Sequence, residues 1–133
     1  MTAAGVRVKG FSHVAIAVDD LAAARAFYCG ILGFEELPRP DFGIPGMWLG
    51  VGDLQLHFIE TDELPSPGKG FPHYALPVPT DAFDQTIDAL RGAGVRLLGE
   101  PSSRVDFETT TVLAAFVTDP AGNVIELTNI GAA

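Results

Sequence analysis

An internal repeat constrains this chain more than any other feature of its sequence. Residues 12–20, SHVAIAVDD, align without gaps with residues 72–80, PHYALPVPT, sixty positions later in a chain of 133 residues. Each copy places a histidine near the start of a short alternating strand, and residues that favour a helix start come after it. Two copies at this period predict a pair of similar modules rather than a solenoid.

Both halves are predicted to run strand, helix and then three strands. In the opening strand, Val14, Ile16 and Val18 form an apolar row that alternates with other residues, as expected for a sheet with one buried face. Strands are expected at 11–18, 34–37, 47–51 and 54–60 in the first half, and at 72–78, 95–99, 111–118 and 123–129 in the second.

Short polar residues and glycines predict where the two helices begin and end. Asp19 or Asp20 is expected to cap the first helix and Thr80 the second, with Gly33 and Gly94 at the helix ends. The sequence TDELPSPGKG, rich in proline, glycine and acidic residues, predicts a linker at 61–70. We therefore expect a single α+β domain over 1–133, with a first module at 8–60 and a second at 71–130.

The composition excludes several classes of partner. Seventeen acidic residues against eight basic ones give a formal charge of −9, which disfavours nucleic acids and anionic membranes and favours neutral or cationic small ligands. No apolar run reaches the length of a membrane span, and the first ten residues lack the apolar core of a signal peptide, so a cytoplasmic location is expected. Cys29, the single cysteine, is interpreted as a small packing residue.

The alternation of the strands places all three histidines on the faces opposite the apolar rows. His13 and His73 lie in the opening strands of the two halves, His57 lies in the closing strand of the first half, and Glu126 takes the equivalent place in the second. Imidazole and carboxylate groups on rigid strands suit a divalent transition metal. We predict one metal ion bound by His13, His57, His73 and Glu126, with His57 either a ligand or a base beside the metal; zinc, nickel, manganese, cobalt and iron(II) all remain open.

The sequence resembles the vicinal oxygen chelate superfamily, which includes glyoxalases, bleomycin-resistance proteins and extradiol dioxygenases. The resemblance is carried by the opening histidine, by AFYCGILGF, by LQLHFIE and by DPAGN before IEL. It implies two paired βαβββ modules that form a cup-shaped mixed sheet around the metal, with the helices on the outside. It also places the ligands on the first and last strands of each module. Glyoxalase I-like members usually carry glutamate or glutamine where this chain has His57.

Three functions follow from the predicted site and the resemblance. The first is a metal-dependent lyase or isomerase that chelates a small substrate through two neighbouring oxygens and moves a proton through an enediolate, with Glu126 or His57 as the base. The second is an iron(II) ring-cleavage dioxygenase. The third is a bleomycin-resistance-like protein that binds a cationic drug in a cleft lined by Trp48, Phe42 and Phe107. The resemblance also implies a homodimer, in which the modules pair within one chain or between two. Further candidates for polar contacts to the substrate are Gln55, Thr128 and Arg104.

Overall fold

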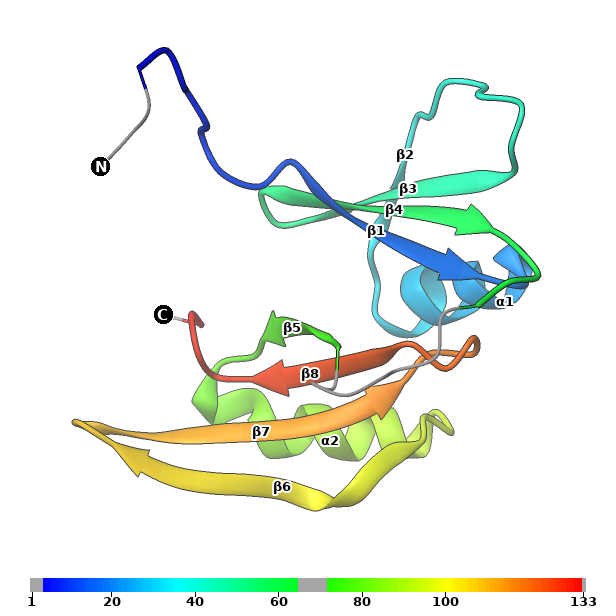
Figure 1. Ribbon diagram of the computed structural model, residues 1–133. Coiled ribbons are helices and arrows are strands. Elements are labelled where there is room, and N and C mark those ends of the chain that lie inside the picture. The colour runs from blue at the N-terminus through cyan, green and yellow to red at the C-terminus, as the bar shows by residue number, and fades with distance from the viewer. Residues whose placement is uncertain (1–3, 65–71, 133) are drawn as a thin grey trace.

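The computed structural model describes residues 4–64 and 72–132, without the side chains of residues 100–104 and 107. The linker predicted at 61–70 therefore lies, from residue 65 onward, outside the described residues. Figure 1 shows the first module, from blue to green, as a layer above the second module, from green to red. Within the described ranges, no helix has the length and apolar character needed to cross a bilayer.

The first module is a four-stranded mixed sheet with one helical segment. Its elements are β1 (His13–Val18), α1 (Leu21–Arg25), the π-helix η1 (Ala26–Ile31), β2 (Glu35–Leu37), β3 (Gly46–Val51) and β4 (Leu54–Glu60). The strand order is β1-β4-β3-β2, with β1 and β4 parallel and the other two pairs antiparallel.

The second module repeats this arrangement. Its elements are β5 (Tyr74–Pro77), the 3₁₀ turn η2 (Thr80–Ala82), α2 (Phe83–Gly92), β6 (Leu97–Phe107), β7 (Thr110–Thr118) and β8 (Val124–Thr128). The order β5-β8-β7-β6, again with one parallel pair, matches that of the first module strand for strand. The α+β fold and the duplication predicted from the sequence are thus confirmed. Strand β6 is longer than expected and contains a register shift between Leu98 and Ser103.

The helix starts were predicted correctly in one module and wrongly in the other. The Asp20 side chain accepts a hydrogen bond from the backbone N–H of Ala23 at 3.1 Å, which satisfies one of the free donors at the start of α1. Thr80 does not cap α2, because the 3₁₀ turn precedes that helix and the Thr80 hydroxyl accepts a hydrogen bond from Asn129 Nδ2 at 2.9 Å.

The first helical segment also departs from regular α-helical spacing. From Ala26 onward it is a π-helix, in which Leu32 N donates to Phe27 O at 3.0 Å. The wider turn lets two consecutive aromatic residues, Phe27 and Tyr28, both enter the core. Ile31 comes three residues after the buried Tyr28, a spacing that in a regular α-helix puts two side chains on one face, yet it is 39% exposed.

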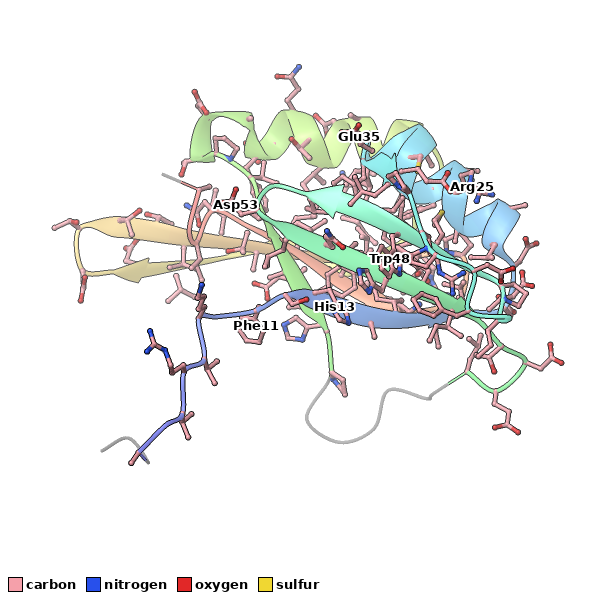
Figure 2. All side chains as sticks on the ribbon, turned by 90° about the horizontal axis from the view of Figure 1, so that it is seen from above. Phe11, His13, Arg25, Glu35, Trp48 and Asp53 are labelled. Carbon is pink, nitrogen blue, oxygen red and sulfur yellow. The ribbon has the colours of Figure 1, made fainter. Side chains whose placement is uncertain are left out.

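Buried side chains from both modules belong to one hydrophobic cluster. The helices contribute residues such as Tyr28 and Phe83, and the strands contribute the apolar rows that include Val18, Phe58 and Ile125. Both helices lie along one side of the molecule when it is viewed from above (Figure 2). Because the apolar rows are buried in this cluster, the alternate residues of β1 and β4 remain on the opposite face of the first sheet.

A buried polar network also joins the two modules. The hydroxyl of Tyr28, in η1, donates to Asp119 Oδ2 at 2.7 Å and lies 2.6 Å from the hydroxyl of Tyr74, in β5. Asn123, in the turn before β8, donates from Nδ2 to the backbone carbonyl of Ala17, in β1, at 2.9 Å. The turn DPAGN therefore connects the two modules as well as β7 and β8.

Candidate functional site

The predicted site residues occupy matching register positions in the two sheets. In the first module, Ala15 of β1 is paired with His57 of β4; in the second, Ala75 of β5 is paired with Glu126 of β8. His13 lies two residues before Ala15, and His73 lies two residues before Ala75. In β1, β4 and β5 the strand parity read from the sequence is correct, because the histidine faces are more exposed than the apolar rows. In β8 every residue except Glu126 is buried, so burial does not separate two faces there.

In the first module, three rings form a continuous stack on the open face of the sheet. The ring centroids of His13 and His57 are 3.8 Å apart with an interplanar angle of 15°, and those of His57 and Trp48 are 4.1 Å apart at 5°. The stack follows from strand pairing, because β3 aligns Trp48 directly with His57. Figure 2 labels His13 and Trp48 over the first sheet. The imidazole of His57 is therefore held between two other rings.

Local hydrogen bonds orient both imidazoles of the stack. His57 Nε2 is 2.7 Å from Gln55 Oε1, so in the neutral ring Nε2 carries the proton and Nδ1 keeps the lone pair. Burial lowers the pKa of His57, and the nearby His13 and Arg39 lower it further. His13 Nδ1 lies 2.8 Å from the hydroxyl of Ser12, which leaves its Nε2 for another partner.

In the second module, the imidazole of His73 and the carboxylate of Glu126 form a pair. His73 Nε2 lies 3.0 Å from Glu126 Oε1, and the two side chains are 31% and 16% exposed. His73 also packs edge to face against Phe116, with ring centroids 5.2 Å apart. An imidazole and a carboxylate are both metal-ligating groups, so this pair could hold a divalent cation together with further ligands.

The four predicted ligands thus form two pairs within one chain. Among residues 4–64 and 72–132, no three histidine, cysteine, aspartate or glutamate side chains are grouped so that they could hold a metal ion. The donor types suit a divalent transition metal, which takes three or four protein ligands in such sites. Each pair alone supplies only two, so the shared four-ligand site remains a prediction.

A cavity of about 600 Å³ opens on the face that carries the ring stack, and its lining includes both histidines of the stack. Sequence reasoning missed one of its lining residues, Arg39, in the loop between β2 and β3. Its guanidinium carbon lies 5.1 Å from the ring centroid of Phe42. The segment LPRPDFG, with a single cation between two prolines, is the signal that could have drawn attention to this loop.

The remaining candidates have mixed outcomes. Gln55 and Trp48 line the cavity and contact His57, as described above. Thr128 is buried, and its hydroxyl accepts a hydrogen bond from Ile130 N at 3.2 Å, so it does not face an open site. The side chains of Arg104 and Phe107 lie outside the described residues. Cys29 packs against the hydrophobic cluster, which is consistent with a packing role.

Sequence comparison identifies relatives that are named as enzymes. The chain is 34% identical over 125 residues to a probable lactoylglutathione lyase from Synechocystis, covering 86% of this chain and 91% of that protein. It is 30% identical over 135 residues to an ethylmalonyl-CoA/methylmalonyl-CoA epimerase from Cereibacter sphaeroides, covering 90% and 96%. Its identity to the mitochondrial methylmalonyl-CoA epimerase of Bos taurus is 27% over 127 residues, covering 87% and 71%.

Structural comparison gives the same family. A glyoxalase family protein from Enterococcus faecalis superposes with a TM-score of 0.71 at 29% identity, covering 90% of this chain and 97% of that one. The fosfomycin resistance protein FosX from Listeria monocytogenes shares the fold, with a TM-score of 0.78 at 22% identity and 92% coverage of both chains. The profile of the Glyoxalase/Bleomycin resistance protein/Dioxygenase superfamily matches residues 10–127, and the chain belongs to this superfamily.

Proposed function

We propose that this protein is a divalent-metal-dependent lyase or isomerase that removes a proton from a carbon next to a substrate carbonyl and then returns it. The observation that carries the proposal is that His57 and Glu126 occupy the same register position in two similar sheets, each beside a second imidazole. The second imidazole is His13 in the first sheet and His73 in the second. The names of its relatives, a lactoylglutathione lyase and two acyl-CoA epimerases, support this class of reaction.

We further propose that two copies of the chain complete each metal site. One chain contributes His13 on its first sheet, with His57 beside it either as a further ligand or as the base, and the second contributes His73 and Glu126 on its second sheet. The reason is that each pair has two donors, whereas a stable divalent site needs about three protein ligands or more. A twofold dimer built in this way contains two identical sites.

The chemical roles follow from the donor types and from their positions. A bound divalent ion supplies Lewis-acid stabilisation of the negative charge that builds up on the substrate oxygens. His57 lines the cavity, and its Nδ1 carries the lone pair that a general base requires. Gln55 and the neighbouring rings keep this imidazole in a fixed orientation. Glu126 is the alternative base, since a carboxylate beside His73 can also accept the proton.

The two candidate bases can be separated by comparing metal content with turnover. We expect His57→Gln to lower kcat by roughly 10²–10⁴-fold, as removal of a general base does, while metal remains bound. Replacing Glu126 by alanine is expected to remove both metal and activity. Full metal loss in the His57 variant would instead make His57 a necessary ligand.

The ligand set is tested by a complementation experiment. Metal analysis after reconstitution should give about one ion per wild-type chain and almost none for His13→Ala or Glu126→Ala alone. Unfolding and refolding the two variants together should restore about a quarter of the sites, because half of the random dimers are mixed and each mixed dimer has one intact site. Wild-type metal content in either single variant would refute the ligand assignment. Restoration of no sites in the mixture would refute completion by a second chain.

The reaction class is tested with the same reconstituted protein. An epimerisable acyl thioester and an α-keto hemithioacetal serve as substrates in D₂O, and NMR measures exchange of the substrate α-proton. This exchange should depend on the bound metal. Because iron(II) dioxygenases use similar ligands, a catechol with oxygen serves as the comparison. Ring cleavage without α-proton exchange would replace our proposal with that reaction.

A further inference from the structure

The cavity on the first sheet has a local charge opposite to that of the whole protein. Its lining includes the cation Arg39, and none of the described residues that line it is an aspartate or a glutamate. This is notable in a chain with seventeen acidic and eight basic residues. The overall charge led us to expect a neutral or cationic ligand, but it is the local field inside a cavity that selects a bound ligand.

Arg39 is the permanent charge in this cavity, and it has no ionic partner among the described residues. The two ion pairs found in that part of the chain are Arg25 with Glu36 and His73 with Glu126. The nearest carboxylate in sequence, Asp41, accepts a hydrogen bond from the backbone of Gly43 at 2.8 Å. The charge of Arg39 is therefore available to a ligand.

The structure also holds the Arg39 guanidinium in a defined place. It packs over Phe42, and it lies against Gly46, where an added Cβ would be 2.7 Å from Arg39 Nη2. Its Nε is buried and has no hydrogen-bond partner. Buried polar groups without a partner are rare, because removing such a group from water without replacing its hydrogen bond is costly. The Arg39 side chain is thus well positioned but incompletely satisfied by the protein.

The chemistry of the lining identifies the class of ligand. A planar guanidinium binds a carboxylate through two parallel hydrogen bonds, which matches the two oxygens of that group better than a single point charge would. Beside Arg39, Phe42, Ile44 and Trp48 provide apolar walls for a short hydrocarbon segment. A cationic drug would instead place like charge against Arg39.

We propose that this cavity is a carboxylate-binding subsite, in which Arg39 holds the carboxylate of a small organic acid and the wall formed by Phe42, Ile44 and Trp48 holds its apolar part. The proposal deepens the function proposed above, since it specifies that the substrate carries a carboxylate. Binding to this subsite does not need the metal, however, so it can be tested on metal-free protein without turnover.

Trp48 is a built-in reporter for the test, because it lines the cavity and is the single tryptophan of the chain. Metal-free protein is titrated with butyrate, butyramide and propyl phosphate at constant ionic strength, and Trp48 fluorescence is recorded. We expect a saturable change with butyrate and binding of the neutral amide at least about tenfold weaker, since a hydrogen bond to a charged group contributes that much. No saturable change with butyrate, equal binding of the amide, or tighter binding of the phosphate would overturn the proposal.

Matched variants connect the effect to one side chain. Arg39→Gln should weaken butyrate binding at least about tenfold. Arg39→Lys keeps the positive charge but cannot form two parallel hydrogen bonds to one carboxylate, so it should give an intermediate affinity. Arg91→Gln makes the same charge change at an exposed position on α2 and should bind as the wild type does. Unchanged binding in the glutamine variant, with circular dichroism confirming its fold, would refute the role of Arg39. Because no activity is measured, butyrate binding without α-proton exchange would leave the subsite standing and refute only the proposed reaction.

Discussion

Replacing Tyr28 by phenylalanine tests how the two modules are held together. The Tyr28 side chain is fully buried, and burial raises the pKa of its phenol, so the hydroxyl remains a donor across the usual pH range. It donates to Asp119 Oδ2, and the hydroxyl of Tyr74 then donates to the Tyr28 oxygen. The substitution removes both hydrogen bonds but leaves the aromatic ring in place.

The size of the effect follows from what the change leaves without a partner. Asp119 keeps three donors, from the backbone of Ala121 and from the backbone and side chain of Asn123, so its carboxylate stays largely satisfied. The lost hydrogen bond to a charged group contributes about 1.5–3 kcal/mol, and the Tyr74 hydroxyl loses its acceptor as well. We therefore expect Tyr28→Phe to lower the free energy of unfolding by about 3 kcal/mol, and the melting temperature by about 10 °C.

Tyr74→Phe is the matched control. It removes one hydrogen bond between neutral hydroxyls, while Tyr28 continues to donate to Asp119, so a loss of about 1 kcal/mol is expected. Urea unfolding of metal-free protein at one fixed concentration measures both variants and removes the contributions of metal and of dimer concentration. A loss below about 1 kcal/mol for Tyr28→Phe, or a larger loss for Tyr74→Phe, would show that this network does not stabilise the module interface as argued.

Three further predictions concern the first module. Gly46→Ala should destabilise the protein by about 1–3 kcal/mol in urea unfolding, because its Cβ would collide with the backbone of the adjacent strand and with Arg39; an unchanged midpoint would contradict this close packing. Arg39→Gln should raise the pKa of His57 in an NMR titration of metal-free protein, because the positive guanidinium lowers this pKa in the wild type. A lower His57 pKa in the variant would contradict this electrostatic effect. The hydrogen bond from Arg25 lowers the pKa of Glu36, so the pair stabilises the fold above the ordinary glutamate pKa and loses this effect as pH falls through the lowered value. Both side chains are 45% exposed, so Glu36→Gln should lower the free energy of unfolding by less than about 1 kcal/mol at pH 7 and leave it unchanged at pH 2. An equal loss of stability at both pH values would show that the ion pair is not its cause.

The sequence by itself determined the repeated architecture and the faces of its strands. Alternation along a strand is a local property with a period of two residues, so the apolar row of Val14, Ile16 and Val18 was enough to place His13 on the opposite face. The cap at Asp20 is equally local, because its acceptor and donor lie three residues apart.

Tertiary structure decided which of these side chains meet. Trp48 stacks on His57 because β3 pairs with β4 in one particular register, and Arg39 reaches the same cavity from a loop whose path no local pattern predicts. The bond between Tyr28 and Asp119 likewise joins residues from different modules. Such contacts depend on how whole sheets and helices pack around a shared core, and burial of that core is a sum over both modules rather than a property of any short segment.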